Sequence, residues 1–532
     1  MTEPAQLFDG PNANVLNVSA AVSVVDNDEM GRHLVAQSVI RPGALLIEEL
    51  PYASIVDERL LRSFCDYCLQ LIPFDRARHN CERCDAELTY CSTACLSSAR
   101  CAYHQWECGG VYPLLSSTQL NMYSLLLAVR IFVQTPVDSL IECCQLSDDD
   151  QPVAPVTLRT STDFHRSLLC LTSDQEHITD DERTGLPKVA GAIADMLVRN
   201  GFLQSDSWAK FDMNVDQRTQ LCRSTLTRIF HRLSRNNQGI WEHRTIEDPV
   251  LAAAVEKAES LKATAMFPTA VLLNHGCLPN VHMVFLERGR VQLRAIRRIE
   301  PGEPLAHSYG MKMGEMTRER RQTALLTNYY FRCTCAACSS AAYLLIETEM
   351  NALKCPQCAT TISHELAYEC GRCKRAYDAV AGRTTDELRS WTETLRRCES
   401  ELRFHGVPIA YTAAQLVERL EQFERCCHEN NKLVNELRLV TVQLLLELDS
   451  ASTAQPIAMR LLKTTKRLFG AETRRTGHAM SLLSRCYAST GHEMYFVTTA
   501  AMIRIYTCHL GPHFLENMPP CTASSAQLAA CD

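Results

Sequence analysis

Cysteine is the residue type whose spacing says most about chemistry in this chain. Between residues 65 and 108, seven cysteines and one histidine occur in close pairs, namely Cys65, Cys68, Cys81, Cys84, Cys91, Cys95, His104 and Cys108. Thiolate and imidazole groups in such pairs are typical ligands of tetrahedral Zn²⁺, and eight of them fill two sites with no position open for water. The segment therefore predicts two structural zinc ions.

Two more cysteine groups follow in the second half of the chain. Cys333, Cys335 and Cys338 are closely spaced. The second group consists of two Cys-x2-Cys knuckles of zinc-ribbon type, Cys355, Cys358, Cys370 and Cys373. We expect the knuckles to bind one further zinc ion; the alternative is four free thiols in a loop.

Charge and composition limit the classes of function. The 532 residues include 54 Lys and Arg and 61 Asp and Glu, for a net charge of -7, and 46% are hydrophobic. This composition is that of a folded globular protein of several domains. The net negative charge disfavours electrostatic attraction of the whole protein to nucleic acid or to an anionic membrane. Within 65–108, four arginines stand against six acids, so attraction of this segment to phosphate is weak as well.

The sequence contains no run that suits a membrane or a secretory signal. The best candidate for a span, Met122 to Val133, is shorter than the roughly 20 apolar residues required and carries Arg130. The first ten residues include Glu3 and Asp9 and lack a basic and an apolar region. We expect a protein of the cytosol or nucleus, where 27 cysteines are better explained by metal than by disulfides.

Three motifs resemble those of SET-domain methyltransferases. They are Asn-His-Gly-Cys-Leu-Pro-Asn at 274–280, Gly-Glu-Pro-Leu-Ala-His-Ser-Tyr at 302–309 and Phe331-x-Cys333-x-Cys335-x2-Cys338. The opening segment from Gly31 to Ala36 is similar to that of the same family, and the pairs in 65–108 are similar to a MYND zinc finger. A SET domain split by such a finger and followed by a helical tail is the SMYD architecture, and divergent insect-type members resemble this chain in some of its departures.

The resemblance implies an enzyme that transfers a methyl group from S-adenosylmethionine to a protein lysine, on a histone or another protein. Asn274 and His275 would hold the cofactor, Arg32 would meet its carboxylate and Phe331 would pack near its adenine. Tyr309 would contact the cofactor at the methyl-transfer site, and Tyr329 would be a second tyrosine of the lysine channel. A desolvated aromatic channel lowers the pKa of the lysine and so supplies the neutral amine.

The resemblance also implies how the zinc ligands pair. In the finger the pairs interleave, so that Cys65, Cys68, Cys91 and Cys95 hold one ion and Cys81, Cys84, His104 and Cys108 hold the other. Cys277 would join the three cysteines at 333–338 in a third site, which clamps the segment after the SET core onto the cofactor pocket. Two interpretations of the finger remain open. It either stabilises the fold through its metal ions without binding a partner, or it forms a groove that binds proline-rich peptides.

Four positions depart from the family pattern and leave a second function open. Gly276 replaces the usual serine, His33 the second glycine of the cofactor loop, and Pro304 an acidic residue, while His307 occupies a position that is often aliphatic. The alternative is therefore a catalytically weak or inactive adaptor that gathers protein partners, for example in transcriptional repression.

Strands and helices must position these residues. β-branched runs and turn residues predict strands at Val22–Val25, Leu34–Ile40 and Leu45–Ile47, and again at Val281–Leu286 and Val291–Ile296. Apolar spacing predicts helices from Pro113 to about Lys262 and a series of amphipathic helices after residue 380. The last helices are expected at 433–448, 457–469, 478–489 and 495–509.

The expected fold class is α+β: a β-rich SET domain split by a zinc finger and a helical insert, with a C-terminal helical, TPR-like domain. The expected segments are the first part of the SET domain (18–56), the finger (57–108), the helical insert (109–265), the SET core (266–311), the post-SET zinc segment (312–340), the zinc knuckles (341–380) and the helical-hairpin domain (381–520).

Overall fold

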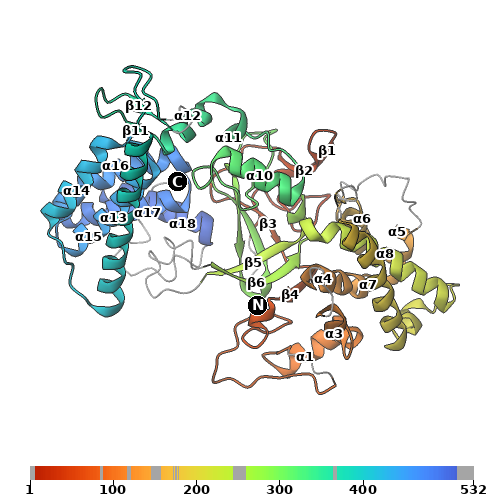
Figure 1. Cartoon of the computed structure of the whole chain (residues 1–532). Helices are drawn as coiled ribbons and strands as arrows, with labels where there is room; N and C mark the ends of the chain where they lie inside the picture. Colours follow the sequence, from red (N-terminus) through yellow and green to blue (C-terminus); the bar gives the residue numbers. More distant parts are fainter. Residues whose placement is uncertain are drawn as a thin grey trace.

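The computed structural model describes residues 6–83, 88–116, 122–144, 157–171, 173, 177, 179–243, 259–363 and 368–511. Small β-sheets occupy the centre of the molecule, as Figure 1 shows. The helical insert lies on one side of them and the finger below, while the C-terminal helices form a lobe on the other side. The predicted mixture of helix and sheet and the C-terminal helical region are confirmed.

The sheets are small and mostly antiparallel. The strands are β1 (Val22–Asn27), β2 (Gly31–Ala36), β3 (Leu45–Glu49), β4 (Ala53–Val56), β5 (Gln238–His243), β6 (Glu259–Met266), β7 (Asn274–His275), β8 (Val281–Phe285), β9 (Val291–Ala295), β10 (Ala306–His307), β11 (Leu353–Lys354) and β12 (Thr361–Ile362). Strands β1 and β2 form a hairpin, and two three-stranded sheets have the orders β3-β9-β8 and β4-β6-β5. Strands β7 and β10 are parallel neighbours.

Pairing between distant segments builds the centre of the fold. In the sheet β3-β9-β8, Glu49 of β3 lies opposite Val291 of β9. The core-facing residues of these strands are β-branched or aliphatic and almost fully buried, among them Leu46, Ile47 and Leu293. Such residues suit a pleated surface with one face on a core, so they hold the register of strands that are far apart in sequence.

The finger and the insert are helical between β4 and β5. The elements are η1 (Glu58–Leu60), α1 (Thr93–Ala99), η2 (Arg100–His104), α2 (Gln105–Glu107), α3 (Val111–Ser116), α4 (Met122–Gln134), α5 (Val137–Cys144), α6 (Ser161–Leu169), α7 (Asp180–Arg199), η3 (Phe202–Gln204), η4 (Asp206–Trp208) and α8 (Val215–Asn236). Helices α6, α7 and α8 each begin at a capping box, as at Thr179 and Glu182 of α7. These reciprocal bonds satisfy backbone N–H groups that a helix start leaves without partners.

The last part of the segment expected to be helical contains strands instead. The insert is helical to Asn236, and β6 then pairs with β4 on one side and with β5 on the other. Strand β6 includes Ala263, Ala265 and Met266, which are fully buried. Alanine and methionine are good helix formers, so their propensity did not indicate a strand; pairing with both neighbours decides the conformation.

A helical region follows the SET core, which itself contains the short η6 (Ala270–Leu272) and η7 (Glu287–Gly289). The helices after it are α10 (Arg318–Tyr329), α11 (Ala336–Ser339), α12 (Ala341–Met350), α13 (Asp378–His405), α14 (Ala413–Cys426), α15 (Lys432–Glu447), α16 (Ala451–Phe469), α17 (Arg474–Thr490) and α18 (Tyr495–Leu510). The four tail helices expected between 433 and 509 correspond to α15–α18. Residues 512–520 of the expected tail domain lie outside the described residues.

The C-terminal lobe packs against the rest of the chain at the end of α16. Leu468 and Phe469 share a buried cluster with Met311 and Met313, which follow the SET core. Gly314 has φ +81°, and a Cβ there would lie 2.5 Å from the Phe469 ring, so this close approach needs glycine. Among the described residues, no helix combines the length and hydropathy of a membrane span.

Candidate active site and zinc centres

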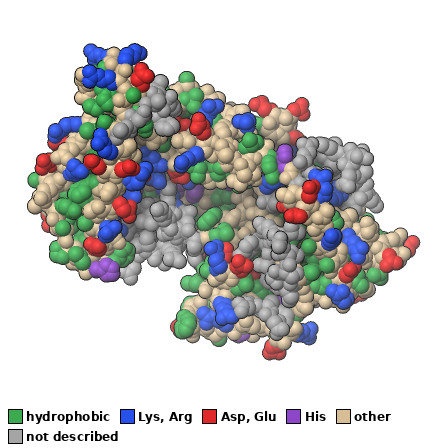
Figure 2. All heavy atoms as spheres, in the orientation of Figure 1, with side chains coloured by type: hydrophobic (Ala, Val, Ile, Leu, Met, Phe, Trp, Pro, Cys, Tyr) green, Lys and Arg blue, Asp and Glu red, His purple; other side chains and the backbone are tan. Residues whose placement is uncertain are grey.

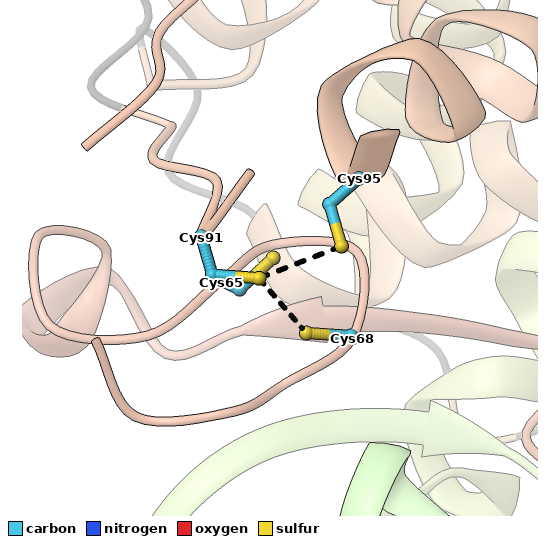
Figure 3. A group of neighbouring side chains, drawn as sticks. All are labelled: Cys65, Cys68, Cys91 and Cys95. Carbon is cyan, nitrogen blue, oxygen red and sulfur yellow. Dashed lines mark hydrogen bonds between the residues drawn. The ribbon is translucent and has the colours of Figure 1, made fainter. Parts of the chain in front are cut away.

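The first metal centre of the finger gathers four sulfurs. The Sγ atoms of Cys65, Cys68, Cys91 and Cys95 all lie within 4.8 Å of one another, and Figure 3 shows the four side chains turned toward a common point. Cys91 Sγ is 3.5 Å from Cys95 Sγ and 3.6 Å from Cys68 Sγ. Four thiols at this spacing and largely shielded from water fit a tetrahedral zinc ion.

The second centre of the finger has three of its expected ligands in the described residues. Cys81, His104 and Cys108 offer ligand atoms within 4.8 Å of one another, and Cys81 Sγ lies 3.8 Å from Cys108 Sγ. Cys84, the expected fourth ligand, lies outside the described residues. The two groups are interleaved along the chain, as the resemblance to a MYND finger implied.

The third centre brings Cys277 together with Cys333, Cys335 and Cys338. Arg321 is fully buried beside it, and its Nε donates to Cys277 Sγ at 3.2 Å. A buried guanidinium that donates to sulfur favours thiolate over thiol, because it compensates negative charge. This arrangement fits a zinc ion held by four thiolates, and Arg321 is a residue that sequence analysis missed.

The fourth centre is formed by the two knuckles. Cys355, Cys358, Cys370 and Cys373 offer sulfurs within 4.8 Å of one another next to the short hairpin β11–β12. Cys355 Sγ lies 3.5 Å from Cys373 Sγ, and Cys358 Sγ lies 3.5 Å from Cys370 Sγ. The structure brings together all four residues singled out in the sequence, and their donor set suits zinc.

The predicted cofactor motif lies where β7 pairs with β10. Asn274 pairs with Ala306 and His275 with His307. This pairing places Tyr309, two residues after His307, over His275: the Tyr309 amide donates to His275 Nδ1 at 3.1 Å, and the Tyr309 hydroxyl donates to the Leu273 carbonyl at 2.8 Å.

Five aromatic side chains from three segments meet around Tyr309. Its ring centroid is 4.8 Å from that of Tyr329, 5.3 Å from that of His275 and 5.0 Å from that of His307. Phe331 joins the cluster at 6.3 Å from His275. The structure therefore brings together Asn274, His275, Tyr309, Tyr329 and Phe331, as the motifs predicted.

Burial sets the protonation of this cluster. Desolvation raises the pKa of Tyr309 and that of Tyr329, so both phenols keep their protons at neutral pH. Desolvation lowers the pKa of His275 to about 4 and that of His307 to about 3, so both imidazoles are neutral. Among the described residues, the buried Nε2 atom of His307 has no hydrogen-bond partner. The cluster is uncharged and polar; His275 is buried, and the other four side chains are half-buried.

Comparison with known protein families identifies the domain that contains these motifs. The model of the SET domain matches residues 31–310, which include the motifs at 274–280 and 302–309 and, of the cluster, His275, His307 and Tyr309; Tyr329 and Phe331 follow the matched range. The chain belongs to the SET domain family.

Curated proteins similar to this SET-domain protein include a lysine methyltransferase and a protein named for its SET and MYND domains. It is 26% identical to "Protein-lysine N-methyltransferase SMYD4" of Danio rerio over 421 residues, which cover 66% of this chain and 55% of that protein. A SET and MYND domain-containing protein of Dictyostelium discoideum is 22% identical over 333 residues, covering 59% and 80%. The SET model and these relatives place the protein in the SMYD family.

The likeness is partial. The chain spans about half the length of the SMYD4 proteins that it matches. Among solved structures, "Structure of Rubisco LSMT bound to Sinefungin and Monomethyllysine" covers 84% of this chain and 89% of that chain at 11% identity and a TM-score of 0.25, a value too low to support an argument.

The side chain of Arg32 in this SET-domain protein makes hydrogen bonds within the chain. Its guanidinium donates to the hydroxyl and the carbonyl of Ser167 on α6, both at 2.6 Å. The turn just before it is tied to the cofactor motif, because Asn274 Nδ2 donates to the Met30 carbonyl at 3.1 Å. His33 is buried and its Nδ1 lies 2.8 Å from the Gly31 carbonyl. Only Gly31 has positive φ here, so His33 is not strained.

Gly276 is explained by its neighbour. A Cβ at this position would lie 3.0 Å from the Cβ of Ala306, which is closer than ordinary contact. The glycine therefore lets β7 and β10 approach each other in a way that the usual serine would crowd.

Sequence analysis also missed a clamp on the segment between Tyr329 and Phe331. Tyr330 has φ 58°, an unusual value for a side chain of its size. Its ring stacks on His177 at 4.1 Å, and the guanidinium of Arg235 from α8 lies 3.9 Å from the ring centroid. These contacts stabilise the strained residue and thereby fix the two cluster residues that flank it. No sequence motif marks this clamp.

A buried charged group ties the finger to the insert. Arg130 of α4 donates to Asp66 at 2.9 Å and to Glu107 at 2.9 Å, and its guanidinium lies 4.0 Å from the ring centroid of Tyr103. Asp66 and Glu107 adjoin the zinc ligands Cys65 and Cys108, so Arg130 contacts both halves of the finger. The interruption of the apolar run by Arg130 was the one sign of this role in the sequence.

Proposed function

We propose that this SET-domain protein is a protein-lysine N-methyltransferase that uses S-adenosylmethionine. The observation that carries the proposal is the meeting of Tyr309 and Tyr329, with ring centroids 4.8 Å apart, beside His275 and Phe331. Three segments distant in sequence contribute to this cluster. The printed names of its relatives, which include a "Protein-lysine N-methyltransferase" of Danio rerio, support the same reaction.

The cluster suits the transfer of a methyl group to an amine. S-adenosylmethionine supplies a methyl group activated by a cationic sulfonium, so the protein chiefly has to align the reactants and exclude water. An uncharged aromatic surface disfavours the ammonium form of lysine, whose ordinary pKa is about 10.4, and so favours the neutral amine. The uncharged, half-buried aromatic cluster around Tyr309 offers such a surface.

The resemblance to SET-domain methyltransferases implies the roles that we propose for the site residues. Asn274 and His275 on β7 would hold the cofactor with their backbone and side chains, and Arg32 would meet its carboxylate from the edge of the β1–β2 hairpin. Phe331 would pack against the adenine. Tyr309 would position the methyl-transfer centre, and Tyr329 would line the path of the lysine.

Cofactor binding is the first test of the proposal. The zinc-loaded protein is titrated with S-adenosylhomocysteine in a calorimeter, and we expect saturable binding at one site. His275→Ala should weaken that binding, whereas His282→Ala, on the adjoining strand β8 and outside the cluster, should not. The absence of heat at high protein concentration would contradict the enzyme function.

One observation favours the alternative function as an adaptor. The guanidinium of Arg32 is held by Ser167, so part of its hydrogen-bonding capacity is already used within the chain. If this contact withholds Arg32 from the cofactor, Ser167→Ala should restore or strengthen binding of S-adenosylhomocysteine. Weaker binding in this variant would contradict the adaptor function and favour a supporting role of Ser167.

The finger offers a surface for the proline-rich peptides that its resemblance implies. Phe74 is 95% exposed beside a cavity of about 500 Å³, which is lined by Arg62, Ser63, Phe74, Arg78, Asn80 and Thr89. A large exposed aromatic group at a cavity is typical of binding surfaces. Phe74→Ala should abolish binding of proline-rich peptides in a fluorescence polarisation assay while leaving zinc content unchanged.

The protein substrate and the compartment follow from the same chemistry. On the face in Figure 2, Lys and Arg are interspersed with Asp and Glu, which supports a protein partner over a nucleic acid or a membrane.

Fifteen of the cysteines belong to the four centres discussed above, whose ligands require reduced thiols. We therefore propose the cytosol or the nucleus as the compartment, and immunofluorescence with fractionation tests this.

A further inference from the structure

Glu49, at the end of β3, is a buried acid outside the residues assigned so far. Its side chain is 4% exposed, and burial raises the pKa of its carboxyl to about 7. The carboxyl accepts hydrogen bonds from two backbone amides. Ala270 N donates to Oε1 at 2.8 Å, and Thr269 N donates to both oxygens, at 3.2 Å to Oε1 and 3.1 Å to Oε2. Burial disfavours the ionised form of this acid, and the hydrogen bonds from Ala270 and Thr269 offset part of that cost.

The two amides begin a short turn that ends at the active-site cluster. In η6, Leu273 N donates to the Ala270 carbonyl at 3.1 Å. The carbonyl of the same Leu273 accepts the hydroxyl proton of Tyr309 at 2.8 Å. A continuous series of hydrogen bonds therefore runs from the Glu49 carboxyl through the turn to the hydroxyl of Tyr309.

Both oxygens of the Glu49 carboxyl accept hydrogen bonds at this position. A carboxylate presents an acceptor to each of the two amides, whereas the amide of a glutamine has one acceptor oxygen and one N–H₂ donor. In a glutamine with its oxygen at the Oε1 position, that oxygen still reaches both amides, but the N–H₂ group lies 3.1 Å from the Thr269 N–H, so two donors face each other. The geometry therefore distinguishes Glu49 from its closest isostere.

We propose that Glu49 is a positioning residue for methyl transfer, which holds the η6 turn so that the Leu273 carbonyl fixes the hydroxyl of Tyr309 at the transfer site. The inference rests on the proposed methyltransferase function. Glu49 acts through backbone groups and touches neither substrate nor cofactor, so its effect is confined to the orientation of Tyr309.

A double-mutant cycle tests the series of hydrogen bonds. Glu49→Gln should lower kcat about tenfold with the KM for S-adenosylmethionine unchanged, because the reactants still bind but the hydroxyl is less well held. In a Tyr309→Phe background, which lacks the hydroxyl, Glu49→Gln should have no further effect on kcat. The matched control is Glu48→Gln on the same strand, where Glu48 pairs with Arg290 at 3.0 Å and has no contact with the turn.

Two results would overturn the inference: an equal loss of kcat in both backgrounds, which would indicate a general structural defect, and no loss in either. Hydrogen exchange of a peptide covering 268–275 gives a readout that does not need activity. Exchange there should be faster in Glu49→Gln and unchanged in Glu48→Gln. If the wild-type protein transfers no methyl group, the proposed function has failed, and unchanged exchange in Glu49→Gln would separately overturn the role of Glu49 in the turn.

Discussion

The hydroxyl of Tyr309 has one proton, and the Leu273 carbonyl accepts it at 2.8 Å. Its oxygen lone pairs are therefore directed away from that carbonyl, which is where a partially positive methyl group would be met. Burial raises the pKa of the phenol, so Tyr309 does this as a neutral group. The chemistry assigned to this residue depends on the direction of one hydrogen bond.

Removal of this hydroxyl should slow transfer without loss of binding. We expect Tyr309→Phe to lower kcat about 10²-fold, equivalent to about 2.7 kcal/mol of barrier, with little change in affinity for S-adenosylhomocysteine, because the ring still packs. Single-turnover transfer from labelled cofactor to a screened protein substrate measures this. Tyr329→Phe should cost less. Wild-type turnover in Tyr309→Phe would show that the active site is elsewhere.

The side chains in this cluster could be predicted from the sequence, but their partners could not. The motif spacing identified Asn274, His275 and Tyr309, because each lies in a short run with a recognisable order. Arg321, Glu49 and Arg235 lie in segments without such a run, and they contribute through contacts with residues distant in sequence. Their roles can be identified only once the fold is known. The glycine at position 276, Gly276, could not be explained from the sequence either, because the methyl group of Ala306 is what crowds a larger side chain there.

At the scale of elements, metal centres and buried charges hold together segments that have few apolar contacts of their own. The segment from Phe331 to Ser339 is short, and its only helix, α11, spans Ala336–Ser339. Its three cysteines join Cys277, which follows β7. A zinc ion there would connect the segment to the cofactor motif directly.

Loss of one thiolate should therefore loosen the pocket at a distance. We expect Cys333→Ser to weaken binding of S-adenosylhomocysteine about tenfold, because Phe331 is no longer fixed while no cofactor contact is removed. Calorimetry measures the affinity, and Cys398→Ser on α13, outside the four centres, is the control. Equal affinities for Cys333→Ser and the wild type would mean that packing alone positions Phe331.

The finger should depend on Arg130 in the same way. Arg130→Ala leaves Asp66 and Glu107 buried without their partner, which should lower the free energy of unfolding by about 3–5 kcal/mol. Thermal unfolding with excess zinc measures the loss. Arg223→Ala, which removes an exposed pair with Asp195 on the same insert, should cost less than about 1 kcal/mol. Similar losses in the two variants would show that the Arg130 group does not hold the finger.

Element prediction succeeded where periodicity was strong and failed where pairing decided the outcome. The tail helices α15–α18 follow their apolar spacing closely. Strands β5 and β6 lie in a stretch read as helical, because their residues carry no alternating pattern; their conformation comes from pairing with each other and from the pairing of β6 with β4. Helix α10, which carries both Arg321 and Tyr329, was not singled out either, since most of its surface is polar.

At the scale of the whole molecule, metal centres occur in three separate regions: the finger, the SET core and the junction with the tail. Their ligands were predicted as four sets of four, and the structure brings together fifteen of those sixteen residues. Because the sets share no ligand, each should load independently.

We expect four zinc ions per chain. Native mass spectrometry should give a mass increase of four zinc ions, and a strong chelator should reverse it with loss of folded structure. The double variant Cys355→Ser and Cys358→Ser should contain three ions and keep its affinity for S-adenosylhomocysteine. A wild-type stoichiometry of two would mean that only the finger is metallated.

The pairing of β3 with β9 also matters while the chain is being made. Glu48 and Arg290, which form an ion pair across these strands, are 242 residues apart. At a synthesis rate of about 5–20 residues per second, β3 leaves the ribosome roughly 10–50 s before its partner exists. The finger, whose ligands lie within 65–108, is complete long before that and can take up zinc on the nascent chain. Its early closure shortens the free chain between the separated strands, while β3 remains an unpaired edge that chaperones must cover until β9 emerges.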